Sequence, residues 1–200
     1  MSDKPEEHII ATCILCDEKI TVDGEERVVL DKDAKSGKTA IFLEDIVKID
    51  NKSYHAREIT AEEAKTKILA NTGDNGKIPF FCVHGFSNQP NAVIDEIASR
   101  KDVFENSKYY PVFVVWPCSS IFSEGGVIGY QPDSDTNTIE SGEAFYDFVS
   151  KIPDDTFPRK SLMMHSMGNH VVFNGACFLG APEVQFENIF MVAAVRKYFV

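Results

Sequence analysis

The sequence contains no long run of apolar residues. No stretch approaches the roughly 20 residues that a membrane span needs, and the polar start MSDKPEEH cannot serve as a secretory signal. Basic charge is also scarce, because 20 lysines and arginines face 31 aspartates and glutamates, a formal net charge of −11. These shortages predict no membrane span, and they argue against nucleic acid or an anionic membrane as the main partner.

Cysteine is sparse and odd in number. The five residues are Cys13, Cys16, Cys82, Cys118 and Cys177. Scattered cysteines without an export signal indicate a reducing compartment, so we expect a cytoplasmic protein. Cys13 and Cys16 have the spacing of half a zinc knuckle, but a structural zinc site needs two more ligands, usually a second pair, which the sequence lacks. We expect no metal and no cofactor, and two cysteines that pack as small apolar residues.

Apolar residues are plentiful enough for a sizeable core, at 44% of the 200 residues against 26% charged. Residues 1–76 read as short antiparallel strands followed by one helix. Asp23-Gly24 is a strong hairpin signal, and Ser36-Gly37 predicts a further turn. These strands are either a separate N-terminal module or an extension of the main sheet.

Local signals also predict where the first helix and the first domain end. Thr60 and Glu63 form a capping box, in which each side chain can bond a free N–H of the first helical turn. The glycine-rich hexapeptide 71–76 ends this helix. We place the domain boundary there, with residues 1–76 as a β-rich segment plus helix and residues 77–200 as the main domain.

Strand and helix patterns alternate after residue 77. Four apolar runs predict strands at 78–83, 111–116, 160–164 and 189–195. Helical patterns cover 91–104, a segment capped by Asn137 and Glu140, and 168–179. This order predicts an α/β fold with a parallel sheet, right-handed crossovers and helices on both faces. Ligands bind such sheets at the carboxyl ends of the strands.

Two of the predicted strands end in loops that can carry chemistry. The first ends in His84-Gly85-Phe86, and the third runs through a sharp turn at Ser166 into a helix. Such a turn exposes the serine Oγ beside a helix N-terminus. If the strands are neighbours, the N–H groups of Phe86 and Met167 can point at one carbonyl oxygen as an oxyanion hole, and Gly85 permits a close approach. The alternative is an ordinary connection with an incidental serine.

The order of the motifs resembles a known superfamily. PFFCVHGFSN, PVFVVWP, LMMHSMGNHVVFNGA and NIFMVAA follow one another as in the alpha/beta hydrolases, closest to an esterase/lipase-like branch of unknown function. The resemblance covers about residues 77–195. It implies Ser166 as the nucleophile, with Phe86 and Met167 as backbone donors. We expect four more residues to border the substrate: His84, Gly85, His165 and Gly168.

The sequence departs from that superfamily at two points. Met164 replaces the first glycine of the G-x-S-x-G motif, and no acidic residue follows the strand ending at Val195, nor any histidine after His170. The usual acid and base of the catalytic triad are therefore absent. The last strand is also an apolar edge, which the N-terminal strands, a partner or a longer chain can cover. We expect the chain to be a truncated form of a longer hydrolase.

Three histidines within the chain are candidates for a substitute base. The side chain of His165 is expected to point away around the turn, and His84 is expected to bond the backbone of its own loop. His170 is best placed, one helical turn after Ser166, although a polar helix cap is the favoured role. Without a base, a serine hydroxyl is a poor nucleophile at neutral pH.

Three functions are compatible with these features. The favoured one is a serine hydrolase that acts on a small-molecule ester, lipid or acyl substrate through an acyl-Ser166 intermediate, and that is not fully active as these 200 residues. The second is a non-catalytic relative that binds a small ligand or a protein partner. The third is an interaction protein that recruits a partner through residues 1–76. No signal indicates an oligomeric state.

Overall fold

The structure is a computed structural model that describes twelve parts of the chain: residues 9–14, 19–30, 35–48, 54–72, 76–86, 93, 96, 103–104, 106–118, 136–151, 159–178 and 184–193. The strands are β1 (Ile9–Ile14), β2 (Lys19–Val22), β3 (Glu25–Leu30), β4 (Lys35–Lys48), β5 (Tyr54–Ile59), β6 (Ile78–Val83), β7 (Tyr109–Val115), β8 (Ser161–His165) and β9 (Asn188–Val192). The helices are α1 (Ala61–Thr72), α5 (Thr138–Ser150) and α6 (Gly168–Phe178).

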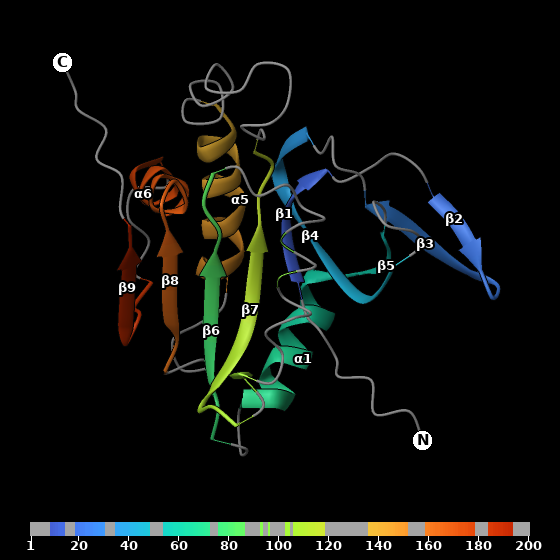
Figure 1. The fold of residues 1–200 in the computed structure, drawn as a ribbon, viewed down its shortest axis with the longest axis horizontal. Coiled ribbons are helices and arrows are strands. Elements are labelled where there is room, and N and C mark those ends of the chain that lie inside the picture. The colour runs from blue at the N-terminus through green and yellow to red at the C-terminus, as the bar shows by residue number, and fades with distance from the viewer. Residues whose placement is uncertain are drawn as a thin grey trace.

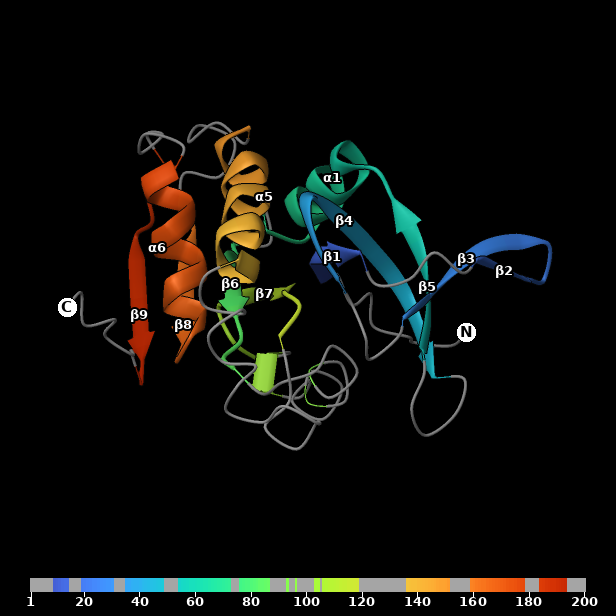
Figure 2. The same cartoon turned by 90° about the horizontal axis from the view of Figure 1, so that it is seen from above.

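The described strands form one sheet with the order β2-β3-β5-β4-β1-β7-β6-β8-β9 (Figure 1). Strands β7, β6, β8 and β9 run parallel, so Phe81 pairs with both Val112 and Leu162. Helices α1, α5 and α6 lie on one face of the sheet (Figure 2). These observations confirm the predicted α/β fold class with a parallel sheet preceded by antiparallel strands.

Aromatic contacts place helical residues on the other face as well. Phe81 meets Phe145 of α5 with ring centroids 5.8 Å apart, whereas its neighbour Phe80 meets Phe104 at 6.4 Å. Successive strand residues point to opposite faces, so Phe104 and α5 lie on opposite sides of the sheet. Phe104 is one of four described residues of the predicted helix 91–104, and the rest of that segment lies outside the described residues.

The N-terminal strands extend the main sheet. Ile10 of β1 pairs with Val114 of β7 in parallel and with Phe42 of β4 in antiparallel orientation. Of the two arrangements left open by the sequence, the structure has the extension. The division into domains at residue 76 stays a prediction, because residues 73–75 lie outside the described part of the chain.

The predicted turn at Ser36-Gly37 is wrong. Both residues lie within the 14-residue strand β4, where Ser36 pairs with Cys13 of β1. The β1–β4 ladder shifts register between Ala11 and Cys13, so the pairing continues past the glycine. Cys16 lies outside the described residues, so the structure places only Cys13 of that cysteine pair.

Two short-range predictions are confirmed and a third is wrong. Asp23 and Gly24 have φ angles of 52° and 84° in the β2–β3 turn, as the hairpin signal requires. The Thr60 N–H donates to the Glu63 carboxylate at 2.8 Å, and the Glu63 N–H donates to Thr60 Oγ1 at 3.2 Å. Asn137, by contrast, makes no side-chain cap bond. Its backbone is already helical, with φ −64° and ψ −37°.

Helices α5 and α6 cross with their backbones in contact. A Cβ atom on Gly142 would lie 2.3 Å from the Val171 carbonyl oxygen, and one on Gly175 would lie 2.4 Å from the Gly142 oxygen. The ring of Phe145, on α5 itself, is fully buried in the core together with those of Phe81 and Trp116. The crossing fixes α6, and with it the turn that leads into α6, against the sheet.

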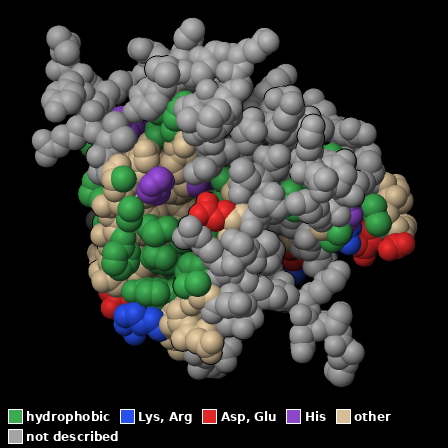
Figure 3. Space-filling view, in the orientation of Figure 1, with side chains coloured by type: hydrophobic (Ala, Val, Ile, Leu, Met, Phe, Trp, Pro, Cys, Tyr) green, Lys and Arg blue, Asp and Glu red, His purple; other side chains and the backbone are tan. Residues whose placement is uncertain are grey.

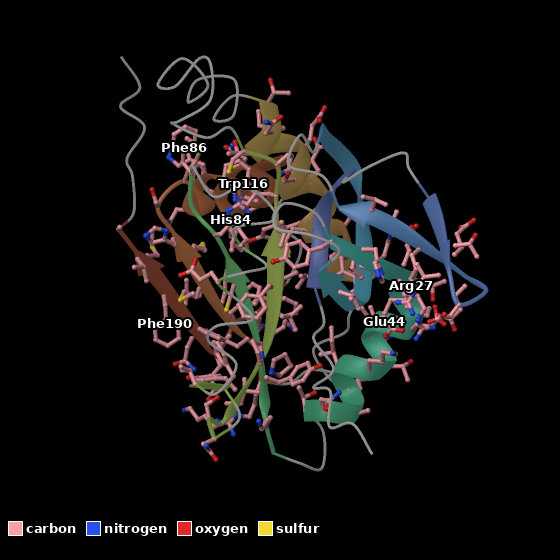
Figure 4. The ribbon with its side chains drawn as sticks, turned by 45° about the vertical axis from the view of Figure 1, so that its right-hand side comes forward. Arg27, Glu44, His84, Phe86, Trp116 and Phe190 are labelled. Atoms are coloured by element: carbon pink, nitrogen blue, oxygen red, sulfur yellow. The ribbon has the colours of Figure 1, made fainter. Side chains whose placement is uncertain are left out.

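A buried carboxylate joins the N-terminal strands to α1. The side chain of Glu44 on β4 is 4% exposed and forms salt bridges with Arg57 of β5 and Lys67 of α1. Figure 4 shows Glu44 beside α1, far from His84 and Trp116. No helix in the described ranges is long and apolar enough to cross a membrane.

Strand β9 forms one edge of the described sheet, and β2 forms the other. The N-terminal strands therefore lie far from β9 and do not cover it. The side chains of β9 are open to solvent, with Ile189 56% and Met191 63% exposed. Figure 3 shows hydrophobic side chains gathered on one face of the molecule, over the side of the sheet that includes β8 and β9.

Candidate active site

Ser166 occupies a strained turn between β8 and α6. Its φ angle is 49°, a left-handed conformation that side chains other than glycine rarely adopt. Three hydrogen bonds hold the turn. The Ser166 N–H donates to the Val192 carbonyl at 2.8 Å, and both the backbone N–H and the side-chain amide of Asn169 donate to the Ser166 carbonyl, at 3.1 and 2.7 Å. A strained serine at a strand-to-helix turn has the geometry of a nucleophile elbow.

The residue after Ser166 supplies an unused backbone donor. Within the described part of the chain, the Met167 N–H has no acceptor, while the N–H groups of Asn169 and His170 bond backward into the turn. The Met167 side chain is fully buried, which fixes its backbone. An unpaired N–H at a helix N-terminus carries partial positive charge and faces outward, so it can receive an oxyanion.

The loop after β6 lies directly against this turn. Strands β6 and β8 are neighbours, with Val83 opposite Met164, so the adjacency that the oxyanion-hole prediction required is present. A Cβ atom on Gly85 would lie 2.6 Å from the His165 ring and 2.9 Å from Ser166 Cβ. Only glycine permits this approach.

Gly168 has a similar steric role on the helix side of the turn. A Cβ atom there would lie 2.6 Å from the His84 carbonyl oxygen and 2.7 Å from that of Val83. The first turn of α6 therefore rests on the backbone at the end of β6. This packing accounts for Gly168 without any contact to a substrate, and its predicted role beside the substrate stays a prediction.

The ring of His84 is occupied by the backbone on both sides. Its Nε2 accepts a hydrogen bond from the backbone N–H of Trp116 at 3.0 Å, and its Nδ1 lies 2.9 Å from the Gly85 carbonyl oxygen. Burial lowers the pKa of His84 to about 4, against its ordinary 6.5. His84 bonds its own loop, as the sequence suggested, and both nitrogens are engaged, so it is unavailable as a base for Ser166.

The other two histidines differ in exposure. His165 is exposed, and its ring borders Gly85. His170 is buried in the first turn of α6, where its N–H donates to the Met167 carbonyl at 2.8 Å. All seven predicted site residues thus lie at the carboxyl ends of β6 and β8: His84, Gly85, Phe86, His165, Ser166, Met167 and Gly168.

Three residues of this region were not assigned a role from the sequence. Trp116 and Cys118 follow β7, where the Trp116 indole donates to the His84 carbonyl at 2.8 Å and the Cys118 thiol lies 3.9 Å from the Gly85 oxygen. Asn169 bonds the turn itself. The only sequence signal for Trp116 and Cys118 was their place at a strand end that faces the same edge. Asn169 lies three residues after the serine, within the motif LMMHSMGNHVVFNGA that carries the resemblance.

The donor groups of this site are backbone N–H groups and a hydroxyl. No group of three or more histidine, cysteine or acidic side chains in the described ranges could hold a metal ion. A hydroxyl beside an unpaired N–H is instead suited to a carbonyl carbon and its oxygen.

Comparison with known proteins gives one match. The profile of a family described as alpha/beta hydrolase of unknown function (DUF900) matches residues 60–193, which is more than half of the chain and includes every residue of the site. Searches of curated proteins and of solved structures find no match.

Proposed function

The chain belongs to the DUF900 family of alpha/beta hydrolases of unknown function, and on that premise we propose that it is a serine hydrolase acting on an ester, lipid or other acyl substrate. The observation that supports this most is the left-handed φ of 49° at Ser166, between β8 and α6. A stable fold has no need of strain at that point, whereas a nucleophile that must stand clear of the sheet does.

The proposed reaction proceeds through an acyl-serine. Ser166 Oγ attacks the carbonyl carbon of the substrate, and the carbonyl oxygen becomes an oxyanion that accepts hydrogen bonds from the Met167 and Phe86 N–H groups. Collapse of this intermediate expels the alcohol and leaves the acyl group on Ser166. Water then attacks the acyl carbon, which releases the acid and restores the hydroxyl. One oxyanion donor is worth about 10²–10³ in kcat in a comparable site.

The proton of Ser166 needs an acceptor. Within the described part of the chain no hydrogen bond to Ser166 Oγ is formed, and His84 has both nitrogens engaged. Within the described part of the chain, these contacts therefore do not identify the base of the proposed reaction.

The lack of a hydrogen bond to Ser166 Oγ within the described part of the chain also supports a second candidate function. A hydrolase relative that binds an ester or a protein partner without turnover needs the site but no base. It is favoured by the absence of a hydrogen bond to Ser166 Oγ among the described residues, because an unactivated hydroxyl reacts slowly.

Labelling with a fluorophosphonate probe separates the two. The proposed hydrolase predicts that wild type is labelled, that Ser166→Ala is not, and that Ser150→Ala, at an exposed serine on α5, is labelled like wild type. If the folded wild type stays unlabelled but binds an ester analogue saturably, the non-catalytic function replaces the proposed one.

A further inference from the structure

The hydrogen bonds of His84 define its protonation state. A backbone N–H can only donate and a carbonyl oxygen can only accept. The backbone N–H of Trp116 donates to Nε2, so Nε2 is unprotonated. The Gly85 oxygen lies at Nδ1, so Nδ1 carries the proton. The ring is therefore a neutral donor to Gly85 and a neutral acceptor from Trp116.

The bond to Gly85 acts on the next residue through the peptide plane. The Gly85 carbonyl and the Phe86 N–H belong to one trans peptide unit, in which the C=O and N–H vectors point in opposite directions. Fixing the oxygen toward His84 therefore fixes the N–H away from it. The Phe86 N–H is one of the two donors of the proposed oxyanion hole.

Trp116 anchors the histidine. Its indole N–H donates to the His84 carbonyl at 2.8 Å, and the two rings stack with centroids 5.3 Å apart and planes 12° apart. Trp116 is fully buried at the end of β7. Figure 4 shows His84 and Trp116 together at the ends of β6 and β7, with Phe86 beyond them. The imidazole is thus held by a rigid part of the core and in turn holds a loop.

Electrostatics keep the ring in this state. Burial lowers the pKa of His84 to about 4, and the hydrogen bonds to Gly85 and Trp116 only partly oppose this. His165 on β8 is the ionisable group that acts on it, and a charge there disfavours a second one on His84. The neutral Nδ1–H form therefore persists throughout the physiological pH range.

We propose that His84, anchored by Trp116, is a positioning residue that orients the Phe86 N–H toward the oxyanion through the Gly85 carbonyl. This inference rests on the proposed acyl transfer at Ser166. It assigns His84 neither a proton-transfer role nor a contact with the substrate.

Two substitutions separate the bonds that His84 makes. In His84→Asn the side-chain amide N–H lies near the position of Nδ1, so the bond to Gly85 is kept and the acceptor for Trp116 is lost. In His84→Gln a polar atom lies near the position of Nε2, so the Trp116 bond is kept and the Gly85 bond is lost. His55→Asn, at a partly buried histidine on β5, is the matched control.

The kinetic test uses p-nitrophenyl acetate, with fluorophosphonate labelling rates as a second readout. His84→Gln is expected to lower kcat by about 10²-fold, the cost of one misplaced oxyanion donor, with KM unchanged. His84→Asn is expected to keep most of the activity, and His55→Asn all of it. Wild-type kcat in folded His84→Gln overturns the proposal, and so does an equal loss in both His84 variants.

An NMR test does not depend on turnover. The wild-type His84 ring is expected to carry its proton on Nδ1 and to show no titration between pH 5 and 8. The Phe86 amide resonance is expected to shift in His84→Gln but not in His84→Asn. A ring protonated on Nε2, or a Phe86 amide unchanged in both variants, overturns the proposal. If wild type fails to react with the probe while these shifts appear, the proposed function fails and the orienting role of His84 stands.

Discussion

The backbone of Ser166 is strained, and hydrogen bonds hold it in the strained conformation. A left-handed backbone costs a residue other than glycine about 1–2 kcal/mol, and the bonds from Asn169 and to Val192 oppose relaxation of the turn. Asp23 adopts the same conformation, with φ 52°, in a hairpin turn that tolerates aspartate. The two positions therefore permit a comparison of strain with and without a proposed chemical role.

Ser166→Gly is expected to raise the free energy of unfolding by about 1 kcal/mol, because glycine adopts positive φ without steric cost, and to abolish fluorophosphonate labelling. Urea denaturation measures the first effect. Asp23→Gly serves as the control and is expected to change stability slightly and leave labelling intact. A Ser166→Gly variant that is less stable than wild type by 1 kcal/mol or more would show that the turn is not strained.

His84 is expected to make stability depend on pH. Its pKa is about 4 in the folded chain and near 6.5 when unfolded, so between these values the unfolded state binds the proton. The contribution of His84 to the free energy of unfolding is fully present above pH 6.5. It is lost as the pH falls toward 4, by up to about 1.4 kcal/mol per pH unit. His84→Asn lacks this term, so its stability deficit relative to wild type should shrink from pH 7 to 4. A constant deficit contradicts the burial of a neutral ring.

At the scale of elements, the α5–α6 crossing positions the helix that follows Ser166. Gly142 and Gly175 allow the two backbones to touch, and neither residue was singled out from the sequence. Helix propensity alone predicts a gain of about 1 kcal/mol for glycine to alanine. The contact at this crossing opposes that gain.

Gly142→Ala is expected to lower the free energy of unfolding by about 1 kcal/mol, because an overpacking cost of about 2 kcal/mol exceeds the helix-propensity gain of about 1 kcal/mol. Its Cβ would lie 2.3 Å from the Val171 oxygen. Thermal unfolding measures the loss, and Ser150→Ala on the exposed part of α5 should be near neutral. If Gly142→Ala stabilises the protein, the two helices can move apart to accommodate the added methyl group without an energetic cost, which contradicts this prediction.

The Glu44 cluster links β4, β5 and α1, and its charges are unequally buried. The Glu44 side chain is 4% exposed, against 40% for Arg57 and 30% for Lys67. Replacing both cations by methionine leaves a buried carboxylate alone, for an expected loss of about 3 kcal/mol. Glu44→Gln should cost less, because both cations can turn to water. Urea denaturation measures the loss of stability in each variant. An equal loss in the double methionine variant and in Glu44→Gln would contradict the prediction.

At the scale of the whole molecule, local signals gave the elements and their order. The Asp23-Gly24 hairpin, the capping box at Thr60 and the apolar run of β6 each depend on neighbours in the sequence. The alternation of strands and helices then predicted the parallel sheet. The sequence left open whether β6 and β8 are neighbours. The structure shows that they are, so the His84 and Ser166 loops meet.

Contacts between distant segments could not be predicted in the same way. The position of β1 between β4 and β7 depends on tertiary pairing, since Ile10 reaches Phe42 and Val114 across long stretches of chain. The bonds between His84 and Trp116 join two strand ends, and the Gly142–Gly175 contact joins two helices. Each depends on a partner far along the sequence, which no local pattern specifies.

The most direct test of Ser166 as a nucleophile is mass spectrometry of the chain quenched shortly after mixing with p-nitrophenyl acetate. The proposed function predicts one acetyl group on the peptide that contains Ser166, and none on that peptide in Ser166→Gly. A folded chain that acquires no acetyl group, or that acquires it at another residue such as the adjacent exposed His165, would contradict it.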